Sequence, residues 1–279
     1  MSARRSGLMN WLQGALALLG FVLASYGAML GFLWLLQEKL LFVPTTLPQQ
    51  FQLATAPDIH ETWINVPGAR LSALHLQLPD PKGVVFFLHG NGGNLQSWFV
   101  MPDLYRRANV DLFMIDYRGY GKSSGKIESQ AQLQADVRAA WASIAGRYKG
   151  RKLVVYGRSL GSGLAAALSV ELAASTPPDL TVLVSPYVSM VALTHDHYPW
   201  IPSAVLRYPL RTDEWVTRIP NRLLLIHGAQ DPLITPRHSE MLQALAPHAQ
   251  LLRVPGASHN DLQDFPAYLE GFSRALAAL

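Results

Sequence analysis

Short, uninterrupted apolar segments recur along the chain from Val84 onward, and they restrict the fold more than any other feature of the sequence. Continuous apolar runs are typical of strands that are buried on both faces of a sheet. Strands in which apolar and polar residues alternate have one face exposed to solvent. Amphipathic stretches separate the runs, most clearly at residues 128–147, where apolar residues recur at helical spacing. Strands that alternate with helices predict an α/β fold with a mostly parallel central sheet and helices on both faces. The runs are VVFFLHG, VDLFMID, KLVVYG, LTVLVS, RLLLIHG and AQLLRVPG.

Two segments depart from this rhythm. Residues 61–66 and 70–78 alternate around Pro67-Gly68, which predicts an antiparallel hairpin ahead of the parallel strands. Residues 185–220 are rich in proline and aromatic residues, which predicts an insertion rather than another strand–helix unit.

The N-terminal segment is apolar enough to cross a membrane. No charged residue lies between Arg5 and Glu38, and the apolar run exceeds the ~20 residues that span a bilayer. The alternative is a signal peptide, which would have a shorter apolar region and a small-residue cleavage site. We predict a transmembrane anchor over residues 8–36. The positive-inside rule, applied to Arg4 and Arg5, places residues 1–7 in the cytoplasm and the rest of the chain on the extracytoplasmic (periplasmic) side.

The other boundaries follow from composition. Residues 37–62 are expected to form a linker, because the stretch TTLPQQFQLATAPD is polar and contains proline. Residues 63–279 are long enough to form one large domain, with 185–220 inserted in it.

A G-x-S-x-G segment follows one of the apolar runs. An apolar strand leads into Gly157-Arg158-Ser159-Leu160-Gly161, and an alanine-rich helix is expected after it. This arrangement lifts a serine onto a sharp strand-to-helix turn, where its hydroxyl stands clear of the sheet. We predict that Ser159 is a nucleophile. The alternative is an ordinary glycine-rich turn between a strand and a helix.

A serine becomes an effective nucleophile when a base accepts its proton and a third group orients the base. For this kind of turn, the partners follow in the order acid, then histidine, in loops after later strands. RLLLIHGAQDPL places Asp231 after one predicted strand, and LLRVPGASHNDL places His259 after the next. The sequence therefore predicts a triad of Ser159, the orienting acid Asp231 and the base His259.

Residues 89–93, HGNGG, follow the predicted strand that ends at Leu88. A glycine-rich turn leaves backbone N–H groups free to point at a developing oxyanion. We predict that the N–H groups of Leu160 and Asn91 form the oxyanion hole, with Gly92 as the alternative to Asn91.

The loop DYRGYGKSSG at residues 116–125 contains Gly121-Lys122-Ser123, which has the form of the end of a phosphate-binding P-loop. A P-loop needs a glycine at the position that Asp116 occupies. We therefore predict no nucleotide binding.

These segments together resemble the α/β-hydrolase family of serine hydrolases. HGNGGN, DYRGYGKSSG, GRSLGSG, HGAQDPLI and GASHND occur in the order and spacing of the family, over the chain from about residue 60. The apolar N-terminus and the segment LLFVP at residues 40–44 are similar to the membrane-anchored subfamily with one N-terminal helix. The resemblance implies the α/β-hydrolase fold and hydrolysis of esters, thioesters or amides through an acyl-enzyme. It also implies that residues 116–119 form a tight glycine-rich turn near the active site, in which Gly119, Gly121 and Gly125 serve the backbone geometry and Lys122 is solvated.

The composition excludes several kinds of cofactor and binding partner. A chain without cysteine has no disulfide, iron–sulfur or thiolate zinc site. The net charge of +4 comes from scattered lysines and arginines, which argues against nucleic-acid binding. His195 and His197 lack an obvious third ligand, so we predict no metal site, and we expect no cofactor.

The insertion is expected to form a short lid. Tyr187, Met190, Tyr198 and Trp200 are candidates for lining an acyl pocket, and the alternative is that they pack the insertion against the domain. Because an anchor holds the site near a bilayer, we predict acyl ester or thioester substrates, either lipid-like or acylated proteins. A peptidase or amidase on the same fold, and a catalytically silent binding module, are the alternative functions.

Overall fold

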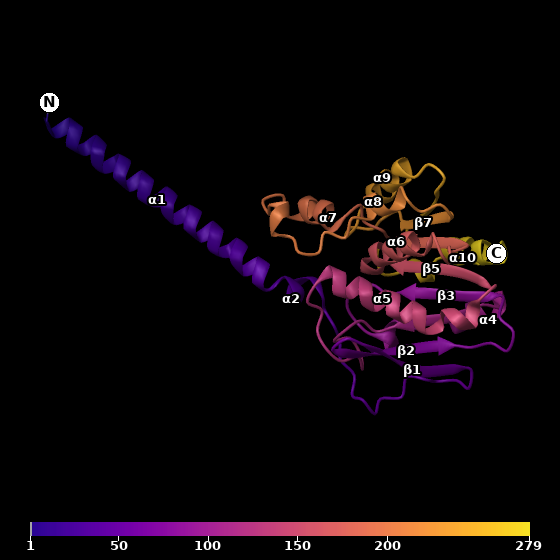
Figure 1. Ribbon diagram of the computed structural model, residues 1–279. Coiled ribbons are helices and arrows are strands. Elements are labelled where there is room, and N and C mark those ends of the chain that lie inside the picture. The colour runs from indigo at the N-terminus through magenta and orange to yellow at the C-terminus, as the bar shows by residue number, and fades with distance from the viewer. Residues whose placement is uncertain (1) are drawn as a thin grey trace.

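The structure, a computed structural model, describes residues 2–279, with side-chain surroundings from Met9 onward. It consists of one long N-terminal helix followed by an α/β domain (Figure 1). Met1, part of the segment predicted to be cytoplasmic, lies outside the described residues.

One eight-stranded sheet forms the centre of the domain, in the order β1-β2-β4-β3-β5-β6-β7-β8. The predicted hairpin is present, since β1 and β2 pair antiparallel across Pro67-Gly68. β2 also runs antiparallel to β4, and every other pair of neighbours is parallel. The predicted α/β class with a mostly parallel sheet is therefore confirmed. The strands are β1 (Ile59–Val66), β2 (Ala69–Leu76), β3 (Gly83–Leu88), β4 (Asp111–Ile115), β5 (Lys152–Arg158), β6 (Leu180–Val184), β7 (Arg222–Gly228) and β8 (Gln250–Val254).

Both faces of the sheet are buried, as the continuous apolar runs require. Successive residues of a strand point to opposite faces. In β3, Val84 and Phe86 belong to one apolar cluster, while Val85 and Phe87 belong to the other. Helices cover the sheet, one pair contributing to the first cluster and one pair to the second, together with other helices (Figure 1). The two pairs are α5 (Gln130–Ala145) and α6 (Leu160–Leu172), then α4 (Pro102–Ala108) and α10 (Pro266–Ala277).

The carboxyl ends of the parallel strands face the N-terminal helix. In Figure 1 the arrow of β3 points toward α2 (Gln37–Leu41). In α/β sheets, ligands bind at this edge, where the loops after the strands meet. The insertion between β6 and β7 also begins at this edge and contains α7 (Met190–His197), η2 (Ser203–Val205) and α8 (Thr212–Val216). The remaining elements are α3 (Leu95–Trp98), η1 (Gly146–Tyr148), α9 (Arg237–Leu245) and η3 (Leu262–Asp264).

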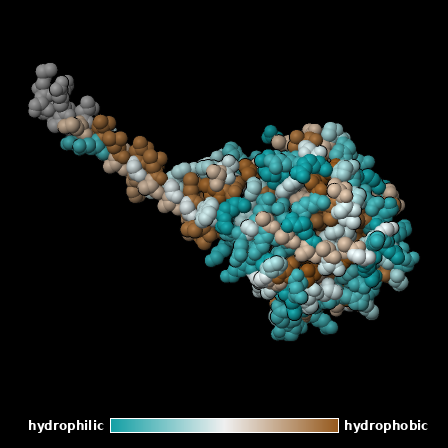
Figure 2. Space-filling model, viewed as in Figure 1, coloured by the Kyte–Doolittle hydropathy of each residue, from teal (hydrophilic) through white to brown (hydrophobic). Residues whose placement is uncertain are grey.

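Helix α1 (Ser2–Leu35) projects from the domain, and apolar residues follow its length (Figures 1 and 2). Its segment Met9–Leu35 is long and apolar enough to cross a membrane, a property that it shares with signal sequences. The side chain of Phe21 is 70% exposed, and none of the most apolar part of the helix is buried by the domain. Such a surface requires another apolar environment.

Residues 37–62, expected to form a linker, lie against the domain instead of spanning open solvent. Phe42 and Leu53 are each only 5% exposed, and strand β1 already begins at Ile59. Polar composition alone did not reveal these contacts, because a few apolar residues and the main chain make them.

The short helix α2 joins α1 to the insertion. Glu38 forms an ion pair with Arg207, with 2.6 Å between Oε1 and Nη1, and also accepts a hydrogen bond from the Tyr208 hydroxyl at 2.9 Å. The Gln37 side chain donates to the Val205 carbonyl and accepts from the Arg207 N–H. The end of α1 is therefore fixed to the domain.

A buried ion pair joins the 116–125 loop to α5. Arg118 donates to both carboxylate oxygens of Asp136, at 2.6 and 2.9 Å, and the two side chains are 5% and 3% exposed. Asp136→Ala leaves a buried guanidinium without its partner, so we expect it to lower the free energy of unfolding by about 3–5 kcal/mol.

Glu171→Ala is the matched control, because its partner Arg138 is an exposed residue of the same helix α5. We expect this change to cost at most about 1 kcal/mol. Urea unfolding of the two variants measures the difference, and equal losses would contradict the structural role given to Asp136.

Candidate active site

Ser159 lies on a strained turn between β5 and α6. Its backbone angles are φ 51° and ψ −121°, a conformation that non-glycine residues adopt at a cost of about 1–3 kcal/mol. Its N–H donates to the Val184 carbonyl at 2.8 Å. A Cβ atom at Gly161 would lie 2.0 Å from the Leu88 carbonyl oxygen, so only glycine permits α6 to approach β3 this closely. The turn presents the half-buried Ser159 hydroxyl at the carboxyl edge of the sheet.

The structure brings the three residues of the predicted triad into one hydrogen-bonded chain. The Nε2 atom of His259 lies 3.0 Å from the hydroxyl oxygen of Ser159. The Nδ1 atom of the same ring lies 2.7 Å from Oδ2 of Asp231. The loops after β5, β7 and β8 supply the three side chains, as the order of the sequence segments predicts.

Asp231 is held as a carboxylate. Burial would raise its pKa, but hydrogen bonds from His227 and His259 and from the Ile234 N–H outweigh burial and hold the pKa well below its usual range. Its Oδ1 atom also accepts from the N–H groups of Leu233 and Ile234, at 3.0 and 2.9 Å. An ionised Asp231 favours the His259 tautomer with the proton on Nδ1, which leaves Nε2 free to accept from Ser159.

The two predicted oxyanion donors lie on neighbouring elements. Leu160 is the first residue of α6, and the N–H groups of a helix's first turn have no partner within the helix. Asn91 lies in the loop after β3, and its N–H has no hydrogen-bond acceptor among residues 2–279. Both groups are therefore free to bind an oxygen atom of a ligand.

Residues 41–47, which we call the strap, hold the loop that carries Asn91. This contact was not predicted from the sequence. The Asn91 amide donates to the Leu41 carbonyl at 2.6 Å and accepts from the Val43 N–H at 3.0 Å. The Tyr120 hydroxyl donates to the same amide oxygen at 2.8 Å. Thr45 continues the contact, since its N–H donates to the Gly93 carbonyl. The segment that follows the N-terminal helix is thus part of the site's support.

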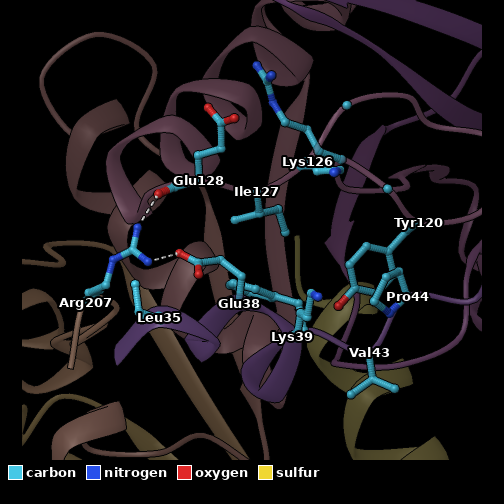
Figure 3. Close-up of a pocket in the computed structure, with 14 residues that line it drawn as sticks. Leu35, Glu38, Lys39, Val43, Pro44, Tyr120, Lys126, Ile127, Glu128 and Arg207 are labelled. Carbon is cyan, nitrogen blue, oxygen red and sulfur yellow. Dashed lines mark hydrogen bonds and ion pairs between the residues drawn. The ribbon is translucent and has the colours of Figure 1, made fainter. Parts of the chain in front are cut away.

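A cavity of about 650 Å³ lies at the base of α1 (Figure 3). Val43 and Tyr120 line it, together with Leu35 from the end of α1 and Lys126, which directly follows the 116–125 loop. Because Val43 and Tyr120 also hold Asn91, the wall of this cavity and the support of the predicted oxyanion loop are made by the same residues.

The side chain of Arg158, the residue before Ser159, supports the main chain of His259. Its Nη2 atom donates to the His259 carbonyl at 2.9 Å, and Nη1 donates to Gln263 at 2.9 Å. Its guanidinium lies 5.5 Å from the ring centroid of Trp98. Arg158, Trp98 and Asn91 line a cavity of about 520 Å³ beside the triad. Sequence reasoning missed Arg158, although its place inside G-x-S-x-G was a usable signal.

The predicted pocket residues lie elsewhere than expected. Tyr187 is fully buried, and its hydroxyl donates to the Leu160 carbonyl, so it supports α6 from within the core. Met190 is half-buried and packs against the core as the first residue of α7. Tyr198 and Trp200 are 53% and 46% exposed at the far end of the insertion. The structure thus favours packing for the first two and an outward position for the other two.

The His195-Asp196-His197 segment joins the insertion to the domain. Asp196 accepts from His238 Nε2 at 2.8 Å, and His197 Nε2 lies 2.8 Å from the Leu233 carbonyl oxygen. Burial lowers the pKa of His238, which also accepts the Val188 N–H at Nδ1 and is therefore neutral. Within the described residues, no group of three metal-binding side chains comes together.

The 116–125 loop forms a tight turn, with positive φ at Gly119, Gly121 and Gly125. The prediction of a solvated Lys122 is wrong. Its side chain is only 5% exposed, and its Nζ atom pairs with Glu61 at 2.5 Å and donates to the Phe51 carbonyl. Lys122 is occupied by these partners and serves the packing of the loop.

Comparison with known proteins identifies the family. A sequence profile described as "Serine aminopeptidase, S33" matches residues 79–212. A Xenopus laevis protein named "Alpha/beta hydrolase domain-containing protein 17B" is 30% identical over 217 residues, which cover 75% of this chain and 72% of that protein. The chain belongs to the α/β-hydrolase family of serine hydrolases. A Mycobacterium tuberculosis protein, named only as uncharacterized, is 29% identical to this hydrolase over 92% of the chain and 91% of the relative.

Solved structures share the fold. An esterase of Pyrococcus furiosus superimposes with a TM-score of 0.65 at 18% identity, covering 85% of this hydrolase and 96% of the esterase. A soluble variant of monoglyceride lipase from Saccharomyces cerevisiae gives 0.61 at 15% identity, covering 83% and 98%. The predicted α/β-hydrolase fold is therefore confirmed.

The strap contacts of Asn91 lead to a prediction. Asn91→Ala removes the side chain that joins the strap to the loop after β3, so the loop's N–H groups lose their fixed position. We expect turnover of a chromogenic acyl ester to fall by about 10- to 100-fold with little change in KM, because small displacements of catalytic groups cost about this much.

Gln96→Ala is the control, because Gln96 is exposed on the adjacent helix α3. It should retain full turnover. Unchanged turnover in Asn91→Ala, or an equal loss in Gln96→Ala, would contradict the role of the strap.

Proposed function

We propose that this chain is a membrane-anchored serine hydrolase that cleaves carboxylic ester or thioester bonds through an acyl-enzyme intermediate. The hydrogen-bonded chain of Ser159, His259 and Asp231 is the observation that carries the proposal. A serine on a strained turn, an imidazole within hydrogen-bond reach and an ionised acid behind it are the parts that nucleophilic acyl transfer needs.

In the proposed reaction, Ser159 Oγ attacks the acyl carbonyl carbon while His259 Nε2 accepts the hydroxyl proton. The carbonyl oxygen becomes an oxyanion, which the N–H groups of Leu160 and Asn91 stabilise. The tetrahedral intermediate collapses, the bond to the alcohol or thiol breaks, and His259 returns the proton to this leaving group. A water molecule then repeats the sequence on the acyl-enzyme and releases the acid and free Ser159. Asp231 stays ionised throughout.

The direction of α1 supports lipid-like or acylated substrates. The anchor leaves the domain at the carboxyl edge of the sheet, the same edge that carries Ser159 (Figure 1). The relatives in fold include an esterase and a monoglyceride lipase. In the proposed arrangement, the site faces the bilayer that holds the acyl chains.

The proposed topology places the N-terminus in the cytoplasm and the catalytic domain on the extracytoplasmic, periplasmic side. Arg4 and Arg5 before the apolar helix support it. A membrane-impermeant maleimide added to intact spheroplasts should then label a cysteine introduced at Leu245, which is 47% exposed. Labelling only after lysis would place the domain in the cytoplasm.

Hydrolysis of peptides or other amides is the second candidate. The profile that matches residues 79–212 is described as a serine aminopeptidase, and the same triad chemistry cleaves amides. A catalytically silent binding module is less well supported, because all three triad positions are occupied and in hydrogen-bond reach.

Fluorophosphonate labelling tests the nucleophile. Such probes react with an activated serine, so the purified full-length chain should be labelled and Ser159→Ala should not. Ser143→Ala, on the remote helix α5, should be labelled as the native chain is. Undiminished labelling of Ser159→Ala, or no labelling of a folded native chain, would contradict the proposal.

A series of acyl esters that differ only in chain length tests the substrate class, with aminopeptidase substrates assayed in parallel. We expect kcat/KM to rise from acetyl to longer chains, because a buried CH₂ group contributes about 0.8 kcal/mol. Activity restricted to acetyl esters would count against lipid-like substrates, and preferential cleavage of peptides would favour the second candidate.

A further inference from the structure

We propose that residues 198–201, which we call the tip of the insertion, enter the interfacial region of the bilayer beside α1 and form a second membrane contact. The proposal rests on the membrane anchor of the proposed function. It explains why Tyr198 and Trp200 are large aromatic residues in an exposed position, since neither contributes to the buried core.

The tip lies directly against the anchor helix. The Tyr26 hydroxyl of α1 donates to the Trp200 carbonyl at 2.6 Å. Further along, the Arg207 guanidinium lies 5.0 Å from the ring centroid of Trp34, near the end of α1. The insertion therefore lies along α1 from Trp34 back to Tyr26. The side chain of Tyr26, at this contact, is 37% exposed, whereas that of Phe21, which precedes the contact, is 70% exposed.

The position of Tyr26 sets the depth of the tip. The apolar segment Met9–Leu35 has 27 residues, which span about 40 Å of helix at about 1.5 Å per residue. The hydrocarbon core of a bilayer is only about 30 Å thick. A core that begins at Met9 therefore ends about 20 residues later, near Met29, within one helical turn of Tyr26, and the rest of α1 lies beyond it. Tyrosine and tryptophan are enriched at this boundary, which is the level of Tyr26 and Trp200.

The sequence of the tip suits this position. Residues 198–206 read YPWIPSAVL and contain no charged residue. Pro199 and Pro202 have no N–H group, and the Ile201 N–H donates to the Tyr198 carbonyl within the turn. Fewer backbone donors therefore lose water when the turn enters the interface, which lowers the cost of insertion.

The exposed apolar side chains are concentrated around the anchor. In the described chain outside α1, most of the large apolar side chains that are exposed lie on segments at the carboxyl edge, whereas Met241 and Leu245 lie on α9. Contiguous exposed apolar surface marks a site of interaction, and the neighbouring anchor makes a bilayer the occupant that fits. Figure 2 shows apolar residues along α1 and where it meets the domain. The edge residues are Leu40, Val43, Val100, Tyr198, Trp200 and Leu233.

A displacement of the tip on contact with the membrane would be transmitted to the proposed triad through the end of α7. His197, beside the tip, lies 2.8 Å from the Leu233 carbonyl oxygen, two residues after Asp231. The Leu233 N–H in turn donates to the Asp231 carboxylate. His197, the residue before the tip, is thus joined to the predicted orienting acid Asp231 by two hydrogen bonds through Leu233.

Because the sequence contains no cysteine, a single introduced thiol can be labelled specifically, which allows a direct test. Trp200→Cys, Phe21→Cys and Leu245→Cys each introduce the sole thiol of the full-length chain, which then carries a bimane fluorophore. The labelled proteins are reconstituted into phosphatidylcholine–phosphatidylglycerol vesicles with lipids brominated near the head of the acyl chain. Bromine quenches by contact, so quenching reports lipid and not burial in protein. We expect loss of fluorescence at positions 200 and 21, and none at 245.

Quenching at position 21 without quenching at 200 would overturn the tip contact and leave the anchor intact. Quenching at neither position would overturn both. Tyr198→Cys provides a second position on the tip and should be quenched as position 200 is. Fluorophosphonate labelling of each variant, run in parallel, reports the nucleophile separately, so a failure of the hydrolase proposal is distinguishable from a failure of the membrane contact.

Discussion

Backbone contact between α6 and the sheet is the constraint on which the site depends. A Cβ atom at Gly157 would lie 2.2 Å from the Gly161 carbonyl oxygen, and one at Gly161 would lie 2.0 Å from that of Leu88. β5, α6 and β3 therefore pack without side chains between them. This packing holds Ser159 at a positive φ of 51°. Such a strained backbone conformation persists only where the surrounding structure prevents it from relaxing. The position of the hydroxyl, and so its 3.0 Å distance to His259, follows from this packing.

The three residues of the proposed triad could be picked out because of where they occur relative to the strands. Ser159, Asp231 and His259 each follow an apolar strand, and the carboxyl ends of parallel strands meet at one edge. Their proximity is a property of topology, which the pattern of apolar runs reveals. Lys122 could not be placed in this way. Its partner Glu61 comes from the antiparallel hairpin, and only the folded sheet brings the two together.

Which aromatic side chains of the insertion point into the core and which point outward could not be predicted from the sequence either. Tyr187 lies in the loop after β6 and points into the core, while Tyr198 and Trp200 lie on a turn that is outside the core. Composition shows that rings are present and leaves open what they face. The strap is a similar case, because main-chain groups of Leu41, Val43 and Thr45 make its contacts, and the identity of their side chains does not encode them.

The strap and the tip together determine what the proposed anchor does for catalysis. From Tyr26 to Leu41 the chain is almost entirely helical, and its fifteen residue steps cover about 22 Å at most. Because Leu41 binds Asn91, the predicted oxyanion loop would lie within about 25 Å of the proposed membrane boundary by the same helical rise. A scissile bond in the bilayer must cross that distance, whereas a water-soluble ester arrives freely. In the proposed function, selectivity for membrane substrates would therefore depend on the strap and the tip, while the triad would determine only which bond is cleaved.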